Sequence, residues 1–544
     1  MSEKEGLWKR FAWRAFVALL PLVFIILFAL FALPLRRAGP VVLAFLAIVI
    51  SLHFLVLIVF GLFKPIRRRP HATSTYCLWC VALLLTLPFS FTETAFRVGD
   101  VNSILMTIAE NRATEMVAVG IEGFIVEFWI LVAGTIGLFL LGYLMIKFAY
   151  MGRGTLVALA LLLLIANPLT KFVFRSIVPH PAQALIAADV EDLAPLIREA
   201  PAVQKNLIIL YLESLERTYS ELEATQEAFA QLAQFEKSGH AFSNLHQLNA
   251  NFFTAGGLVA SQCGVPLLPR GVFNARRRIH DNIDVIPEES DFLSGATCLG
   301  DILTEQGYNA SYLNGSPLTI FSKGAFFRSH GFQRVKGLES YQGYESEPRS
   351  NVWGMDDDLL FERVKDELRW LVDQDQPFVL TSLTIATHGP DGYLDQDCMP
   401  MNTTEPPLIS AIRCSGSHVK SLLAEVDDLG IRDDTLVVLL SDHLAFKNTL
   451  HADLLGVSKQ RRNYAVILGD QKTTNMREGT LMDIYPTLLE IMGFELEGNR
   501  AGLGRSLIGK TPTLLETFGL NRLNNAINTN APLQKAIWQD AKAN

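Results

Sequence analysis

Apolar residues form long runs in the first third of the chain and shorter runs, alternating with helical patterns, in the rest. A segment needs about 20 predominantly apolar residues to cross the hydrocarbon core of a membrane. The first run is longer than the apolar region of a secretory signal, about 7–15 residues, and more such runs follow it. We therefore expect a membrane domain over residues 1–175 with five spans, at 11–33, 41–63, 75–91, 123–148 and 155–174.

The distribution of lysine and arginine predicts the orientation of these spans, because cytoplasmic loops carry an excess of both. Arg36 and Arg37 are the main basic residues on the other side, and the segment 92–122 there is mostly acidic. The N-terminus is therefore expected in the cytoplasm, and five spans place everything after about residue 175 outside it. The basic residues on the cytoplasmic side are Lys4, Lys9, Arg10, Lys64, Arg67, Arg68, Arg69, Lys147 and Arg153.

The exported part, 201–544, has the pattern of an α/β domain. Several of its strand-like runs are continuously apolar, which is typical of strands buried on both faces. Strands that alternate with helices predict a mostly parallel sheet covered by helices. The prolines of residues 176–200 indicate a linker with a short amphipathic helix. Expected strands are 206–214, 307–315, 378–388, 435–443 and 464–470, and expected helices are 298–307, 359–374 and 417–430.

Charge and cysteine content narrow the picture further. A net charge of −8 gives no basic surface for nucleic acid. Outside the cytoplasm thiols become oxidised, and four exported cysteines allow three pairings, among which the sequence does not choose. Pairing between neighbours, Cys263 with Cys298 and Cys398 with Cys414, is our working expectation, with unpaired buried thiols as the alternative.

Polar residues stand at the carboxyl ends of three expected strands. Glu213 ends the first, His388 follows the third, and Asp442 and His443 follow the fourth. Functional residues of open α/β sheets gather at this edge. Each residue taken alone could be a helix cap or a turn residue, but together with Thr254 they form a candidate site.

The chemistry of these residues is mutually consistent. Carboxylate oxygens and an imidazole nitrogen suit Mn²⁺ or Zn²⁺, and a threonine hydroxyl in the same shell would be acidified. Such a hydroxyl is a nucleophile. Thr254 is expected in a glycine-rich turn with Gly256 and Gly257, where a tetrahedral phosphorus could approach closely.

Six ordered motifs in the exported domain resemble the phosphoglycerol transferase I family, which decorates osmoregulated periplasmic glucans in Gram-negative bacteria. More broadly, the chain resembles the lipoteichoic acid synthase and sulfatase superfamily, whose C-terminal motif it carries at 482–507. The resemblance implies an exported domain of the alkaline phosphatase or sulfatase type. The motifs are IILYLESLERTY (208–219), FFTAGGLVASQCGVPLL (252–268), FSKGAFFRSHGF (321–332), WGMDDDLLF (353–361), THGPDGYL (387–394) and LLSDHLAFKNT (439–449).

The resemblance also implies roles for individual residues. One divalent ion, Mn²⁺ with Zn²⁺ or Mg²⁺ as options, would be held by Glu213, Thr254, Asp442 and His443, with Thr254 as nucleophile. His388 would contact the phosphate and assist the leaving group, and Lys323 and Trp353 would line the headgroup pocket.

The implied reaction moves phosphoglycerol from phosphatidylglycerol to a glucan hydroxyl in the periplasm. It passes through a covalent intermediate on threonine and releases diacylglycerol. The enzyme would remain a multi-pass protein of the inner membrane, in contact with membrane lipids.

Two other functions remain open at this stage. A phosphoethanolamine transferase acting on lipid A or glycan would share the five spans and the metal-bound threonine. A non-enzymatic, sulfatase-like regulator that binds lipid should lack a ligand or the nucleophile, whereas all are present here. A sulfatase activity is excluded, because CGVPLLPR (263–270) has the wrong spacing for a formylglycine motif.

Overall fold

The computed structural model divides into two compact units, one comprising Met1–Val101 with Phe124–Phe174 and the other Asn102–Gly123 with Arg175–Asn544. The residues that the structure describes are 72–96, 100–110, 125–148, 153–177, 186, 189–190, 193–269, 291–341, 349–398, 404–457, 461–469 and 471–538. The predicted spans 11–33 and 41–63 lie outside these residues.

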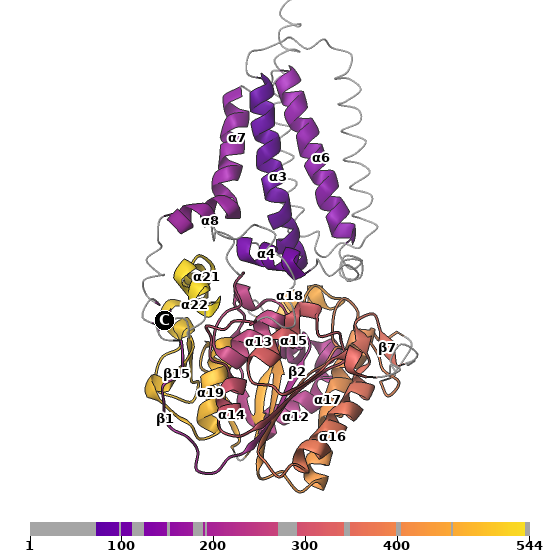
Figure 1. Ribbon diagram of the computed structural model, residues 1–544. Helices are drawn as coiled ribbons and strands as arrows, with labels where there is room; N and C mark the ends of the chain where they lie inside the picture. The colour runs from indigo at the N-terminus through magenta and orange to yellow at the C-terminus, as the bar shows by residue number, and fades with distance from the viewer. Residues whose placement is uncertain are drawn as a thin grey trace, which may run out of the picture. The chain divides into compact units, whose positions relative to one another are not determined.

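Helix α3 (Ala72–Phe96) contacts both α6 (Ile125–Phe148) and α7 (Arg153–Ala166) in the first unit (Figure 1). Trp79 of α3 lies in a buried cluster that includes Ala160 of α7, and its indole N–H donates to a backbone carbonyl of α6 at 3.0 Å. The residues of α3 are apolar on all faces of the helix, which is typical of a helix in an apolar environment.

Among the described residues, Ser74–Glu93 of α3 is long and apolar enough to cross a membrane by length and composition. A second candidate is the bent pair Gly154–Ala166 and Pro168–Phe174, if it forms one broken span. The fourth predicted span contains α6, whose stretch Ile130–Leu144 is apolar but shorter than a full span.

The fifth predicted span, 155–174, is expected to be one helix, but the structure breaks it into two. Helix α7 ends at Ala166 and α8 (Pro168–Ile177) begins after a break, with a bend of 62° between them. Proline has no amide hydrogen to donate and disfavours helical geometry in the residue before it. The Asn167 side chain accepts from the amide of Leu169 at 2.8 Å and so begins the second helix.

The second unit is built on an eight-stranded sheet. Only β11 of these strands runs antiparallel to its neighbours. The expected mostly parallel sheet is therefore confirmed, with one strand that makes it mixed. The strands in spatial order are β12 (Thr473–Asn475), β3 (His240–Phe242), β11 (Ala465–Leu468), β10 (Thr435–Ser441), β2 (Asn206–Leu212), β9 (Phe378–Leu383), β5 (Asn309–Asn314) and β6 (Arg334–Lys336).

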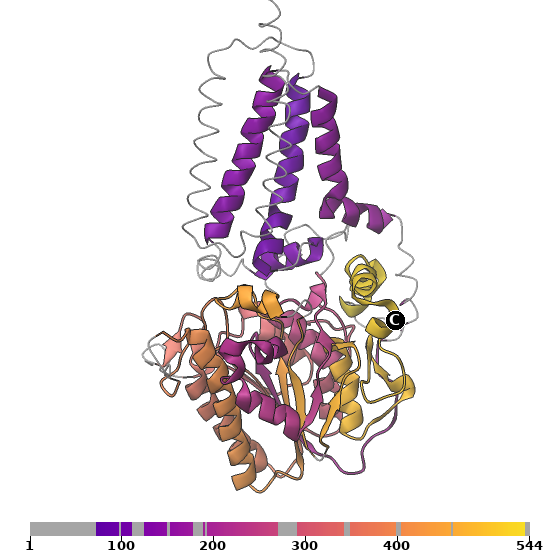
Figure 2. The ribbon, with the colours of Figure 1, turned by 180° about the vertical axis from the view of Figure 1, so that it is seen from behind.

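Helices cover both faces of this sheet, which is why its central strands β2 and β10 are largely apolar and buried on both faces. Ile208 and Leu210 of β2 share a core with residues of α16 (Asp357–Val372) and α17 (Pro407–Asp428), which lie side by side (Figure 2). Tyr211 faces the other side, where its hydroxyl bonds to Ser261 of α13 (Thr254–Cys263) at 2.7 Å. Alternate residues of one strand thus hold two helical layers.

Strand β9 ends at Leu383, five residues before the expected end at His388. Residues 384–388 form a loop instead, and the side chains of Thr384 and Thr387 in it bond to the backbone of Glu213. This loop carries His388.

The structure contains the disulfides Cys263–Cys298 and Cys398–Cys414, the neighbour pairs expected from the sequence. Residues 197–199, in the predicted linker, form β1, which pairs with β14. The remaining elements are α4 (Val101–Glu110), β1 (Ile197–Glu199), α11 (Glu223–Gln226), α12 (Ala230–Ser238), β4 (Leu245–His246), α14 (Leu299–Glu305), α15 (Lys323–Ser329), β7 (Ser350–Asn351), β8 (Gly354–Met355), α18 (His451–Val457), β13 (Gly479–Thr480), α19 (Ile484–Ile491), β14 (Glu495–Leu496), β15 (Arg500–Ala501), β16 (Gly504–Arg505), α20 (Leu514–Phe518), α21 (Leu520–Asn528) and α22 (Ala531–Trp538).

Candidate active site

Three of the predicted ligands meet at the carboxyl ends of the neighbouring parallel strands β2 and β10. Glu213 directly follows β2, and Asp442 and His443 directly follow β10. The Nε2 atom of His443 lies 3.4 Å from a carboxylate oxygen of Glu213 and 3.4 Å from Oδ2 of Asp442. Two atoms that bind one ion at about 2.0–2.1 Å in a tetrahedral shell lie about 3.3 Å apart. The spacing therefore fits a shared ion.

Backbone contacts aim these donor atoms at one another. Asp442 Oδ1 accepts the amides of Ser214 at 2.9 Å and His443 at 2.8 Å, while the buried Oδ2 has no hydrogen-bond partner. His443 Nδ1 bonds to the carbonyl of Leu444 at 2.9 Å. The nitrogen that bonds to a carbonyl must carry a proton, so Nε2 is the atom that could bind an ion once it has given up its own proton.

The charges of this cluster also call for a cation. Burial and the neighbouring Glu213 raise the pKa of Asp442 to about 7. Burial alone would lower the pKa of His443, but Asp442 and Glu213 raise it to about 9. Burial likewise opposes ionisation of Glu213, yet His443 holds the pKa of that carboxyl below its usual range. Two buried carboxylates side by side need positive charge, which a divalent ion would supply.

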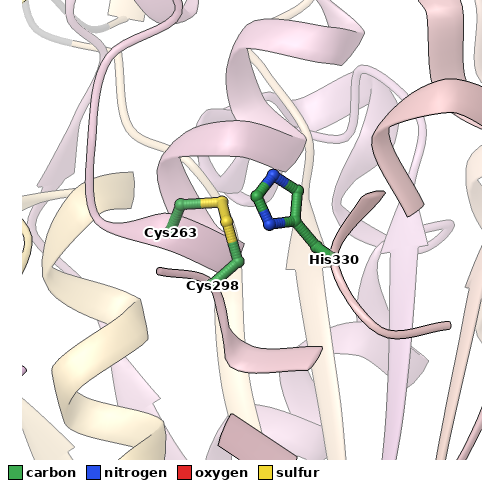
Figure 3. Close-up of side chains that lie close together, drawn as sticks. All are labelled: Cys263, Cys298 and His330. Atoms are coloured by element: carbon green, nitrogen blue, oxygen red, sulfur yellow. A yellow bond between two sulfur atoms is a disulfide. The ribbon is translucent and has the colours of Figure 1, made fainter. Parts of the chain in front are cut away.

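Two other groups of potential ligands cannot offer all their donor atoms to a metal ion. Cys263 and Cys298 lie beside the imidazole of His330 (Figure 3), and Cys398 lies near His418. In both groups the sulfur atoms are bonded in disulfides, and a metal binds a thiolate. Within the described residues, Glu213, Asp442 and His443 are the group whose donor atoms are all available.

The sequence suggests that Thr254 lies in a turn, but in the structure it is the first residue of α13. The two glycines allow this helix to pack closely. A Cβ at Gly257 would lie 1.8 Å from the backbone oxygen of Asp442, and one at Gly256 would lie 2.6 Å from that of Ala250. Neither oxygen could tolerate that contact, so glycine brings the first turn of α13 against the Asp442 backbone.

The start of α13 suits a phosphate group. Its N-cap, Phe253, makes no side-chain cap, and the first intrahelical amide bond is that of Gly257 to Phe253 at 3.0 Å. The amides of the first turn are the usual partners of anions at a helix N-terminus, where the helix dipole also favours negative charge. Thr254, with 5% of its surface exposed, is placed among them.

His388 and Trp353 form one wall of the site. Their ring centroids lie 4.2 Å apart, and the indole N–H of Trp353 donates to the hydroxyl of Tyr393 at 3.0 Å. His388 Nδ1 bonds to the carbonyl of Gly389 at 2.8 Å, which leaves Nε2 as the acceptor nitrogen. Burial lowers the pKa of His388, so the ring is neutral near pH 7.

Lys323, the first residue of α15, is buried, and its ammonium donates to the Ser316 hydroxyl at 2.7 Å. Ser316 and Thr384 escaped sequence analysis, because no periodicity or motif marks a lone hydroxyl in a loop. Thr254, Lys323, Trp353 and His388 line one pocket together with Glu213, whereas Asp442 and His443 are not among its lining residues. The pocket is lined by Glu213, Thr254, Ser316, Ile320, Phe321, Lys323, Trp353, Leu383, Thr384, Ile385 and His388.

An α/β sheet with a buried carboxylate and imidazole set at its carboxyl edge, next to a hydroxyl at a helix N-terminus, suits chemistry on a tetrahedral ester of phosphate or sulfate. The family model described as Sulfatase matches residues 205–494, which is more than half of the chain. The chain belongs to the sulfatase family.

Curated relatives are named phosphoglycerol transferase I, as the resemblance predicted. The protein of Shigella flexneri is 34% identical over 316 residues, which cover 56% of this chain and 39% of that protein. The protein of Escherichia coli O81 is 34% identical over 319 residues, covering 57% of this chain and 40% of that protein. The match thus spans about two fifths of the length of these relatives.

Solved structures include the lipoteichoic acid synthase LtaP from Listeria monocytogenes, with a TM-score of 0.48 and 14% identity over 64% of this chain and 97% of that chain. An alkaline phosphatase superfamily protein from Vibrio parahaemolyticus has a TM-score of 0.46 and 20% identity over 60% of this chain and 78% of that chain.

The ligand set can be tested by metal content. We expect Glu213→Gln to weaken Mn²⁺ binding by more than about tenfold, because a neutral amide replaces a buried anionic ligand. His330→Ala, which alters the group in Figure 3, should bind as the parent does. Elemental analysis of the purified chain after equilibration with Mn²⁺ makes the comparison. Equal content in Glu213→Gln, or loss in His330→Ala, would place the ion elsewhere.

Proposed function

We propose that this chain is a membrane-anchored, metal-dependent phosphoglycerol transferase. The observation that carries the proposal is the convergence of Thr254, the Glu213, Asp442 and His443 set, and His388 at one edge of the sheet. Similarity to proteins named phosphoglycerol transferase I supports the choice of the transferred group.

In the first half-reaction, the Thr254 oxygen attacks the phosphorus of phosphatidylglycerol. A phosphorus–oxygen bond to threonine forms as the bond to diacylglycerol breaks. His388 Nε2 accepts the threonine proton and passes it to the departing oxygen, as a neutral imidazole can. A bound divalent ion would lower the pKa of the Thr254 hydroxyl and offset negative charge on the phosphate. The amides at the start of α13 stabilise the same charge.

In the second half-reaction, a sugar hydroxyl of a periplasmic glucan attacks the phosphothreonine. His388 takes the sugar proton and returns it to the Thr254 oxygen, by the reverse of its first role. The glucan leaves as a phosphoglycerol ester and the enzyme is restored. The order is ping-pong, because diacylglycerol departs before the acceptor reacts.

The proposed location is the bacterial inner membrane, with the sheet domain in the periplasm. The apolar runs of residues 1–175 support a chain that stays with its lipid donor, and α3 provides one helix of sufficient length. Two disulfides in the second unit support an oxidising compartment. We propose Mn²⁺ as the ion, since the O/N donor set suits it as well as Zn²⁺.

The pocket favours a glycerol headgroup over an ethanolamine headgroup. Lys323 brings a buried ammonium to its lining, and Glu213 is the one carboxylate among the described lining residues. The ammonium of ethanolamine would meet like charge in a low-dielectric pocket, which is costly. A glycerol hydroxyl can accept from Lys323 and exchange hydrogen bonds with Ser316. Phosphoethanolamine transfer is therefore the second candidate, and lipid binding without catalysis the third.

The nucleophile can be tested by substitution. Thr254→Ala should lower diacylglycerol release from phosphatidylglycerol by at least about 10³-fold, since no other atom can carry the phosphoryl group. Thr254→Ser keeps the hydroxyl and should retain part of the rate. Circular dichroism and membrane insertion provide the folding controls. Release by Thr254→Ala at a rate near that of the parent would rule out the covalent mechanism.

The headgroup preference can be tested through Lys323. Lys323→Met should reduce kcat/KM for phosphatidylglycerol by about 10- to 100-fold, the range for a lost hydrogen bond to a charged group. Use of phosphatidylethanolamine should not fall with it, so the ratio between the lipids should narrow. The matched control is Lys336→Met, which removes a lysine of β6 that pairs with Glu367 of α16. An unchanged ratio in Lys323→Met would mean that this ammonium does not select the headgroup.

A further inference from the structure

The segment that leads into α16 supports the His388 loop at two points. Trp353, in the turn between β7 and β8, packs against the His388 ring with the two ring planes tilted by 40°. Four residues later, both carboxylate oxygens of Asp357 accept backbone amides of the loop, from Ile385 at 2.8 Å and from Ala386 at 3.0 Å. One contact holds the imidazole and the other holds the backbone that carries it.

The same loop also holds Glu213. The Glu213 amide donates to the Thr384 hydroxyl at 3.0 Å, and the Thr387 hydroxyl donates to the Glu213 carbonyl. Beyond Leu383 the loop makes one backbone bond to β2, from the Thr384 amide to the Tyr211 carbonyl at 3.0 Å, and the Tyr393 amide donates to the Ala386 carbonyl at 2.7 Å. Among the described side chains that contact this loop, Asp357 is the one that binds two consecutive amides, and it ties the loop to α16.

Asp357 is a costly residue to bury, with 2% of its surface exposed. Burial raises the pKa of its carboxyl to about 7, against the loop amides and His418, which favour the charged form. His418 is itself paired with Asp395 at 2.7 Å. A buried carboxylate is stable only where it is hydrogen-bonded and balanced by positive charge. The hydrogen bonds of the Asp357 carboxylate come from amides of the His388 loop.

The two neighbouring aspartates do not contact the loop in this way. Asp356 accepts from the Asn351 side chain at 2.8 Å. Asp358 accepts from the Leu359 amide at 2.7 Å and lies 3.6 Å from the Arg349 guanidinium. In a run of three aspartates, the middle one alone holds the loop, which makes the other two natural controls.

We propose that Asp357 is a positioning residue that acts on the reaction through His388. It fixes the backbone of residues 385–386 and so sets where His388 Nε2 stands relative to the reacting phosphate. The proposal rests on the proposed function in so far as His388 transfers the proton there. A displacement of about 1 Å at a reacting group can cost about 10²-fold in rate.

The test compares Asp357→Asn with Asp358→Asn in the full-length chain. An asparagine offers one acceptor oxygen and one amino group, so it can hold only one of the two loop amides. We expect kcat for diacylglycerol release to fall about 10- to 100-fold in Asp357→Asn, with KM and Mn²⁺ content unchanged. Asp358→Asn should stay within about twofold of the parent. Thermal unfolding is measured for both, and Asp357→Ser replaces the asparagine variant if that one folds poorly.

A double-mutant cycle separates positioning from general structural support. In a His388→Ala background, Asp357→Asn should cost less than about twofold, because its effect passes through the missing imidazole. Equal losses with and without His388, or losses shared by Asp358→Asn, would overturn the proposal.

Failure of the proposed function has a different outcome: the parent itself would release no diacylglycerol. The same cycle is therefore also run with bis(4-nitrophenyl) phosphate, a diester without a lipid headgroup. In that assay the inference about Asp357 stands or falls independently of the natural donor.

Discussion

The close approach of α13 to the strand end at Asp442 governs the geometry of the whole site. Gly257 permits it, because any side chain there would overlap the Asp442 backbone oxygen. The contact brings two binding features together. The N-terminus of α13 favours an anion, and the buried carboxylates and imidazole favour a cation. A hydroxyl between the two can be activated by the cation while the phosphate charge is met by the helix.

Charge balance explains how the rest of the site is arranged around this contact. Asp442 and Glu213 are both buried at adjacent strand ends, and their mutual repulsion is relieved by His443. The pocket is lined by one of these carboxylates, Glu213, and by the ammonium of Lys323, which is buried next to Ser316. In the proposed reaction, the phosphodiester would lie between the ion and the Lys323 ammonium. The neutral glycerol headgroup would contact that ammonium. In the same reaction, the Lys323 ammonium would repel a cationic headgroup.

Much of this arrangement could be predicted from the sequence. Continuous apolar runs located the central strands to within a few residues, and parallel strands bring the residues after them to one edge, so Glu213, Asp442 and His443 could be grouped in advance. The sequence predicts too late an end for β9, because Thr384 and Thr387 are β-branched and continue the strand pattern. Thr254 was placed in a turn because glycine is a poor helix former, whereas here close packing outweighs that cost.

Asp357 could not be predicted, since its partners lie 28 and 29 residues away and are backbone amides, which leave no trace in the residue types. The break between α7 and α8 could have been expected from Pro168, although the hydropathy pattern continues across it.

The central claim is that Thr254 carries the phosphoryl group, and intact-mass analysis tests it most directly. The purified chain is incubated with Mn²⁺ and phosphatidylglycerol, or with phosphatidylethanolamine, without any acceptor. A phosphoglycerol adduct that maps to Thr254 and forms only with phosphatidylglycerol is the predicted result. An adduct on another residue, or none in protein that retains its metal, would contradict the account.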